Sequence, residues 1–171
     1  MSVQLLVTDA GPLTALAVAD VLPAVVQHFG LLVPQTVLDE CLADAYAPGA
    51  ARISQLATAA QGAGQSGLTL LPNAVIVPLD AAFTAGLGTG EVAVLSYAAQ
   101  HQHVALIDER RARRVAHRLK VPVVGSGTVL LALKSQGAVA SIRPALAAWA
   151  KHGYFVSPGL LEQLLSRAGE A

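Results

Sequence analysis

The sequence is poor in several residue types, and each shortage narrows what the protein can be. A single cysteine, Cys41, excludes an internal disulfide and fits a reducing cytoplasm. Because its neighbours are apolar, we expect Cys41 to be a core thiol rather than a nucleophile. Aromatic residues make up only 4% of the chain and charged residues 13%, with a formal net charge of zero. Taken alone, that neutrality argues against a nucleic-acid partner.

Uninterrupted hydrophobic runs are also missing, although 54% of the residues are hydrophobic. The longest stretch without a charge, residues 53–79, is broken by Gln, Gly, Ser, Pro and Asn, which argues against a membrane span. No basic segment precedes an apolar one at the N-terminus, so we predict no signal peptide and a cytoplasmic protein. The excess of Ala, Val and Leu indicates helices packed on a sheet, with apolar surface left for a partner or a homodimer.

The few positive charges are concentrated in one place. Six of the 11 lysines and arginines lie within residues 110–120, and Asp108 and Glu109 are the adjacent acids, so six against two leaves +4 on this stretch. Arginine binds phosphate through paired hydrogen bonds, which suggests a phosphate ligand. We name Arg110, Arg113 and Arg114 as candidates for binding the phosphates of a nucleic acid. Ordinary solubility of an exposed helix, or an acidic segment of a partner protein, would explain the same charges.

Apolar runs and helical spacings alternate along the chain. We predict strands at 3–7, 31–33, 103–107 and 121–124, and a strand followed by a turn within 68–79. Helices are expected at 11–20, 34–46, 49–59, 90–100, after Asp108, and at 125–135, 142–152 and 157–167, with a small-residue linker at 59–67. The alternation predicts an α/β fold of one domain, residues 1–171, with a mainly parallel sheet covered on both faces.

Four carboxylates stand where a strand or turn gives way to a helix: Asp9, Glu40, Glu91 and Asp108. Two carboxylates about 4 Å apart repel by roughly 4 kcal/mol at an effective dielectric of 20, so a cluster of them requires a cation. Carboxylates without histidine or cysteine favour Mg²⁺ or Mn²⁺. Asp9 and Asp108 follow strands directly, at the edge of the sheet where ligands bind in such folds.

The order and spacing of several short motifs resemble one known family. The motifs are VTDAGPLTAL at 7–16, PQTVLDE at 34–40, GTGEVAVLSYA at 88–98 and LIDERRARRVA at 106–116, followed by GSGTVLLALKSQG at 125–137 and GYFVSPGLLEQLLSRAGE at 153–170. Together they are similar to the PIN-domain ribonucleases, of the kind found as the VapC-like toxins of toxin-antitoxin pairs. Each motif is weak by itself, and their shared order makes the resemblance specific.

The resemblance implies a three-layer α/β/α PIN-like fold and a site formed by Asp9, Glu40, Glu91 and Asp108 that binds Mg²⁺ or Mn²⁺. It further implies hydrolysis of RNA by metal-activated water, a cognate antitoxin protein and a homodimer. Two positions depart from the family pattern. Ala10 replaces the usual Thr or Ser after the first Asp, and Glu91 stands where many toxins carry Asp.

Each candidate residue also has an ordinary structural explanation. Asp9 and Asp108 are placed where a helix N-cap is common, Glu91 would suit the first turn of a helix, and Glu40 would suit a solvated face beside Asp39. Trp149, Tyr154 and Phe155 are expected in the core or in an interface, with stacking on RNA bases as the alternative.

Other functions fit the sequence less well. A dinucleotide-binding oxidoreductase is suggested by the glycines at 86, 88 and 90, but these do not follow a clear strand. A phospho-accepting receiver domain would need a second acid beside Asp9. The strongest alternative is a PIN fold kept as an RNA- or protein-binding module with weak or no catalysis.

Overall fold

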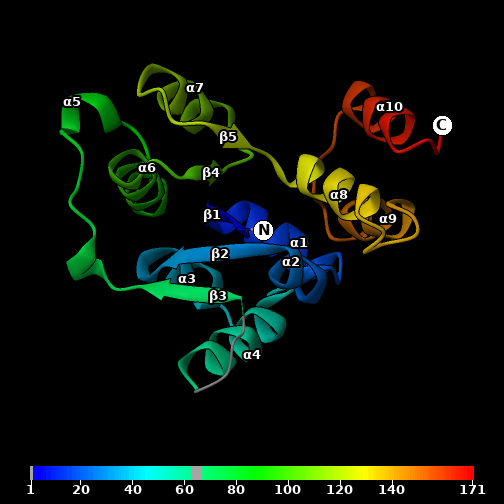
Figure 1. The fold of residues 1–171 in the computed structure, drawn as a ribbon, viewed down its shortest axis with the longest axis horizontal. Helices are drawn as coiled ribbons and strands as arrows, with labels where there is room; N and C mark the ends of the chain where they lie inside the picture. The colour runs from blue at the N-terminus through cyan, green and yellow to red at the C-terminus, as the bar shows by residue number, and fades with distance from the viewer. Residues whose placement is uncertain (1, 63–66) are drawn as a thin grey trace.

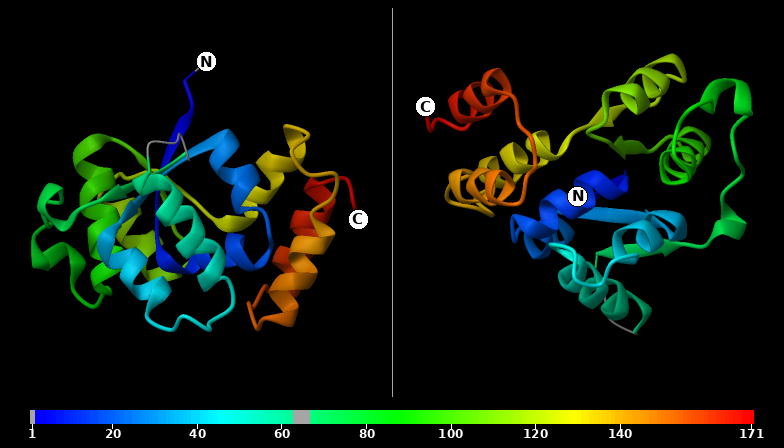
Figure 2. Two further views of the ribbon diagram at one scale, coloured as in Figure 1. Left: turned by 90° about the horizontal axis from the view of Figure 1, so that it is seen from below. Right: turned by 180° about the vertical axis from the view of Figure 1, so that it is seen from behind.

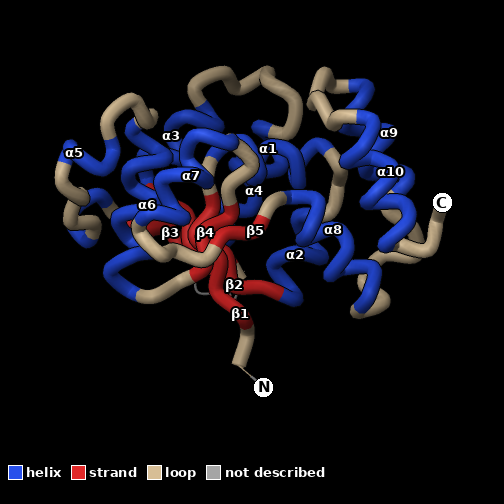
Figure 3. The backbone as a smooth tube through the Cα atoms, turned by 90° about the horizontal axis from the view of Figure 1, so that it is seen from above, coloured by secondary structure: helices blue, strands red, loops and turns tan. Residues whose placement is uncertain are grey.

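The computed structural model describes residues 2–62 and 67–171. Its centre is a five-stranded sheet in the order β3-β2-β1-β4-β5, in which every neighbouring pair is parallel. The strands are β1 (Gln4–Thr8), β2 (Phe29–Pro34), β3 (Leu68–Leu71), β4 (Val104–Leu106) and β5 (Val123–Val124). Figure 1 shows the sheet between helices, and Figure 3 shows the same arrangement from above. The predicted α/β fold with a parallel sheet is therefore confirmed.

Helices connect the strands and cover the sheet. In chain order they are α1 (Ala10–Val18), α2 (Leu22–His28), α3 (Gln35–Leu42), α4 (Ala50–Gln61), the 3₁₀ helix η1 (Asn73–Val75), α5 (Ala81–Thr84), α6 (Thr89–His101), α7 (Arg110–Arg118), α8 (Ser126–Ser135), α9 (Arg143–Lys151) and α10 (Pro158–Arg167). The helix α6 packs on β1, β2 and β4, α4 packs on β3, and α7 packs on β5. The two views of Figure 2 show α9 and α10 together beside α8, at the edge of the molecule.

The core consists almost entirely of aliphatic side chains. β1 and β2 are central strands, and Val7, Leu31 and Val33 on them are completely buried. Such strands read as continuous apolar runs because a parallel sheet is covered on both faces. Phe29 and Trp149 are the buried aromatic residues, and the indole N–H of Trp149, at 2% exposure, donates to the carbonyl of Ala15 at 2.8 Å. This bond fixes α9 against α1, and the expectation of a core position for Trp149 is confirmed.

Some local features differ from the prediction. The helices α2 and α5 are not expected from the sequence: α2 has only seven residues, with a proline at its second position and two valines, and α5 has only four residues. The helix α4 extends to Gln61, into the small-residue segment expected as a linker at 59–67, and residues 63–66 of that segment lie outside the described residues. The last helix begins as predicted, with the Ser157 hydroxyl accepting a hydrogen bond from the Leu160 N–H.

No single helix in residues 2–62 and 67–171 is long and apolar enough to cross a membrane. Only the pair α1 and α2 reaches that length and composition, and these two helices meet at 117°.

Candidate active site

Parallel strands place their carboxyl ends at one edge of the sheet, and the candidate acids lie along that edge. Asp9 follows β1, the central strand, and Asp108 follows the neighbouring strand β4. The backbone N–H of Asp9 donates to the carbonyl of Leu106 at 3.0 Å, which ties the two strand ends together. Glu40 lies on α3, which begins directly after β2 on the other side of β1. The strand order thus brings three of the acids toward one place.

Asp9 is the buried member of the group, at 8% exposure. Its side chain makes no N-cap hydrogen bond to α1, so the structural role that such a position often has is not the one it plays here. The pKa of Asp9 is raised to about 6, chiefly by burial, with a backbone hydrogen bond from Ala10 opposing the rise and the charges of Glu91, Glu40 and Asp108 contributing to it. All three other candidate acids therefore act electrostatically on Asp9.

Gly90, at the start of α6, marks the point where Asp9 and Glu40 approach each other. A Cβ atom at residue 90 would lie 3.1 Å from Glu40 Oε2 and 3.6 Å from Asp9 Oδ1. Glu40 is exposed, as is Asp39, but the two carboxylates have different surroundings. Asp39 accepts a hydrogen bond from the Gln35 side chain at 2.8 Å, along the outer face of α3. Glu40 instead points to Gly90 and Asp9.

Asp108 is held by a residue that the sequence did not identify, Ser126. Asp108 Oδ1 accepts a hydrogen bond from the Ser126 N–H at 2.8 Å, and Oδ2 accepts one from the Ser126 hydroxyl at 2.7 Å. Ser126 is buried at the start of α8, just after β5, the strand beside β4. The signal that could have found it is its position, since it follows a strand as Asp9 and Asp108 do.

Glu91 combines two roles. Its Oε2 accepts a hydrogen bond from the Gly88 N–H at 2.8 Å and so caps the first turn of α6, as its ordinary structural explanation predicts. It also ranks first among the carboxylates that raise the pKa of Asp9. Glu91 is therefore oriented by its own helix while its charge acts on the candidate site.

The donor set fits a hard divalent cation in its chemistry. All four side chains offer carboxylate oxygens, and in the described part of the chain none of the four forms an ion pair with Lys, Arg or His. As these side chains stand, however, no three Asp, Glu, His or Cys residues among those described converge tightly enough to ligate an ion. Asp9 and Glu40 both approach the position of Gly90, and Asp108 is oriented separately by Ser126.

The candidate arginines line two different hollows, one of which is a groove beside Asp108. Arg110 and Arg113 line it together with Asp108 and Ser126, and it has a volume of about 470 Å³. Arg113 also donates to the carbonyl of Ile107 at 2.8 Å, which fixes its guanidinium beside Asp108. Arg114 lines a different hollow of about 530 Å³, with Arg111, Arg118 and His117. Arg111, Arg114 and Arg118 are spaced three and four residues apart, so the sequence already indicates that they share one face of α7.

Two further side chains border the site. Tyr154, in the loop after α9, donates its hydroxyl to the carbonyl of Gly11 in the first turn of α1. The pKa of Tyr154 is raised to about 12, chiefly by burial, with Asp108, Cys41 and Asp9 contributing. Cys41 is itself buried, and burial raises the pKa of its thiol to about 11, as expected of a core cysteine.

Comparison with known proteins identifies the fold family. Residues 5–170 match the model of a family described as a PIN domain (DUF3368). The chain belongs to the PIN-domain family. PIN domains are typically nucleases and usually use divalent metal ions. The resemblance inferred from the motifs is thus confirmed for the domain, and the VapC-like toxin subfamily stays a prediction.

A solved structure supports the same assignment of fold. The chain is similar to a PilT N-terminus domain protein from the hyperthermophilic archaeon Sulfolobus solfataricus P2, with a TM-score of 0.51 and 10% sequence identity. The similarity covers 75% of this chain and 92% of that one. A search of the curated proteins finds no match.

Proposed function

We propose that this PIN domain is a metal-dependent endoribonuclease that hydrolyses RNA phosphodiester bonds with Mg²⁺ or Mn²⁺. The observation that carries the proposal is the electrostatic state of Asp9. Its buried carboxylate has a pKa raised to about 6, in part by three other acids, and no basic side chain in the described residues pairs with it. A fold that keeps such an uncompensated group is suited to a cation at that place.

Asp9, Glu40, Glu91 and Asp108 would hold the metal, directly or through bound water. A bound divalent ion supplies an acidified water molecule and neutralises charge on the phosphate. The chain's own residues position these components: Ser126 orients Asp108, and the Gly88 N–H orients Glu91. Arg110 and Arg113, which line the groove beside Asp108, would contact the RNA phosphates.

The test of catalysis uses labelled single-stranded RNA with the purified protein in Mg²⁺, in Mn²⁺ and in EDTA. We expect cleavage that needs the metal and that is lost in Asp9→Asn, which removes the buried charge at nearly constant size. Glu162→Gln is the matched control, because it neutralises an exposed carboxylate on α10. Cleavage that survived Asp9→Asn would contradict the assigned site.

The alternative is a PIN fold used for binding without cleavage. Ala10 in place of a hydroxyl residue, and the absence of a tight three-acid group among the described residues, are the observations that favour it. Titration calorimetry with Mn²⁺ separates the two functions. A wild-type protein that binds no Mn²⁺ and cleaves no RNA would be a binding module.

The toxin role is the finer part of the proposal, together with an antitoxin partner and a homodimer. Exposed apolar side chains, among them Leu160 and Leu161 on α10, support a protein partner. Induced expression in a bacterial host should arrest growth with the wild type and not with Asp9→Asn. Growth at the normal rate with an active nuclease would exclude the toxin role.

A further inference from the structure

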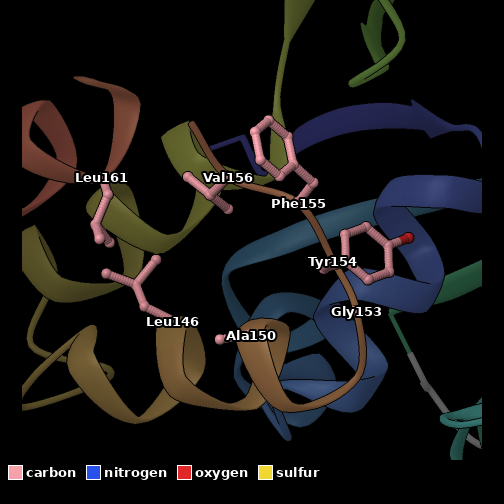
Figure 4. A pocket seen from close by; sticks show the side chains of 7 residues that line it. All are labelled: Leu146, Ala150, Gly153, Tyr154, Phe155, Val156 and Leu161. Atoms are coloured by element: carbon pink, nitrogen blue, oxygen red, sulfur yellow. The ribbon is translucent and has the colours of Figure 1, made fainter. Parts of the chain in front are cut away.

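The loop 153–157, between α9 and α10, forms one wall of the groove beside Asp108. Figure 4 shows this loop with the side chains of Tyr154, Phe155 and Val156. Tyr154 anchors the loop, because its hydroxyl bonds the carbonyl of Gly11, two residues after Asp9. Its ring lies 6.4 Å from the ring of Trp149, which is bonded in turn to Ala15. The loop is therefore fixed to α1, the helix that begins at the candidate site.

Phe155 follows this anchor and is 87% exposed. In Figure 4 its ring points away from the Tyr154 ring. An exposed phenylalanine contributes little to folding, since its ring is not removed from water. Tyr154 anchors the backbone before Phe155, and Ser157 caps α10 after it. The backbone that carries the exposed Phe155 ring is therefore held on both sides.

The surroundings of Phe155 are cationic on the side of the groove. Arg110, Arg113 and Arg167 line the groove with it, and Asp108 is the acidic residue at the site. In the described residues, none of these three arginines forms an ion pair. The volume of about 470 Å³ falls within the range of pockets that hold small ligands. An exposed aromatic ring beside unpaired arginines is the combination that binds single-stranded nucleic acid, through stacked bases and paired phosphates.

We infer that the groove is a subsite for single-stranded RNA, in which one unpaired base stacks on Phe155 and the adjoining phosphates contact Arg110, Arg113 and Arg167. The inference rests on the proposed ribonuclease function and names the residue that would receive one base of its substrate. Bases in an A-form duplex are stacked on one another and do not reach a ring on the protein surface. Phe155 would therefore receive only an unpaired base, in the groove that also contains Asp108.

The experiment measures binding without cleavage, in EDTA, by fluorescence anisotropy of a labelled single-stranded RNA of 12 nucleotides that carries 2-aminopurine. Stacking on an aromatic ring quenches 2-aminopurine fluorescence. We expect Phe155→Ala to weaken binding about 5- to 100-fold and to abolish the quenching, and Phe155→Trp to retain both. Phe83→Ala is the matched control, because Phe83 is 51% exposed on α5, at the opposite end of the molecule from α10 (Figure 1).

Two further comparisons sharpen the result. The wild type should bind the same RNA more weakly when it is annealed to its complement. The Phe155→Ala variant should bind this duplex with the same low affinity as the wild type does. Arg167→Gln should reduce the dependence of log affinity on log salt concentration by about 0.7, the value for one phosphate contact on a single strand. Equal melting temperatures of the variants and the wild type establish that the fold is unchanged.

Several outcomes would overturn the inference: equal affinity of Phe155→Ala and wild type, equal binding of duplex and single strand, or unquenched 2-aminopurine in a wild-type complex. The inference would also be overturned if the wild-type protein formed dimers through Phe155 and bound no RNA. The proposed function fails separately. If the protein binds single strands through Phe155 but cleaves none, the subsite is supported and the nuclease function is contradicted. If the protein cleaves RNA and Phe155→Ala changes neither binding nor cleavage, the nuclease function is supported and the subsite is contradicted.

Discussion

Ser126 holds Asp108 with both of its available donors: the hydroxyl bonds Oδ2 at 2.7 Å and the backbone N–H bonds Oδ1 at 2.8 Å. The two residues come from the ends of adjacent parallel strands, β4 and β5. Such a pair of bonds fixes the plane of the carboxylate. A ligand fixed in this way loses less conformational freedom when it binds a metal ion, and partners of this kind are a regular part of metal sites.

Ser126→Ala should therefore reduce RNA cleavage with little loss of stability. The substitution removes the bond to Oδ2 and keeps the bond to Oδ1, so Asp108 stays near its place but gains rotational freedom. We expect a fall in kcat/KM of about tenfold, the lower end of the effect for such residues, and a loss of about 1 kcal/mol in the free energy of unfolding. Ser135→Ala, at an exposed position of the same helix, is the control. Unchanged kinetics would show that Asp108 needs no such support.

Glu170 joins the last residues of the chain to the segment before α9. Its carboxylate bonds Lys134 at 2.5 Å, the Ser141 hydroxyl at 2.6 Å and the Ile142 N–H at 2.9 Å. The Lys134 hydrogen bond above all lowers the pKa of Glu170 to about 2, with Ser141 and Ile142 contributing. A folded-state pKa below the unfolded value means that the ionised form stabilises the fold above the unfolded pKa, near 4.3.

Glu170→Gln should therefore lower stability at pH 7, and the difference from wild type should shrink as the pH falls from about 4.5 toward 2. Urea unfolding at a series of pH values measures this, with Glu162→Gln as the exposed control. A difference that stayed constant down to pH 3 would mean that the Glu170 charge has no part in the effect.

The sequence predicted the strand-end acids well because their positions depend on local pattern. An apolar run followed by Asp is visible at 3–9 and again at 103–108, and parallel strands necessarily end at one edge. The strand order is not visible in the same way. The position of Ser126 after a strand is visible in the sequence, but its bond to Asp108 requires β5 to lie beside β4, which no local pattern specifies. Tyr154 bonds a residue 143 positions away, a contact that only the complete fold establishes.

The basic helix shows an intermediate case. Its charge and its apolar face were readable from the sequence, and Ala112, Val115 and Ala116 are buried as expected. The division of its arginines between the groove beside Asp108 and the hollow around Arg114 follows from helical spacing, but which face meets the site depends on the packing of α7 against β5. Phosphate binding by these arginines stays a prediction from residue type, and tertiary structure decides which of them face the groove.

Gly90→Ala should weaken metal binding without weakening the fold. The added methyl group would lie 3.1 Å from Glu40 Oε2, 3.3 Å from Val37 Cγ2 and 3.6 Å from Asp9 Oδ1. It would displace the exposed end of Glu40 and crowd the buried side chain of Val37. Alanine is the better residue within a helix by roughly 0.5–1 kcal/mol, which offsets the crowding. We expect Mn²⁺ affinity to fall about tenfold, with the free energy of unfolding changed by less than about 1 kcal/mol.

Gly159→Ala provides a matched control for this substitution. Gly159 is the second residue of α10, as Gly90 is of α6, and a Cβ there would meet no atom within 4 Å. Calorimetric titration with Mn²⁺ should therefore give the wild-type affinity for Gly159→Ala. Equal affinities of all three proteins would mean that Asp9 and Glu40 do not share an ion at Gly90.

The buried charge of Asp9 should destabilise the metal-free protein, and Asp9→Asn should relieve that cost. The pKa of Asp9 is raised from 3.8 to about 6, so the folded state holds a proton that the unfolded state has released. Stability of the wild type then falls as the pH rises from about 4 to 6, and the full cost is present above pH 6. A shift of this size corresponds to about 2 to 3 kcal/mol. In EDTA at pH 8, Asp9→Asn should be more stable than wild type by about this amount, and near pH 4 the two should be equal.

Divalent metal should reverse this ranking of stability, because an ion bound by the folded state alone stabilises it by mass action. Adding Mn²⁺ at pH 8 should raise the melting temperature of the wild type and leave that of Asp9→Asn unchanged. The effect on the wild type should decline below about pH 6, where protons compete with the metal for Asp9. Thermal unfolding followed by circular dichroism, with and without Mn²⁺ from pH 5 to 8, measures both trends. If Asp9→Asn gained as much from Mn²⁺ as the wild type, the ion would bind elsewhere.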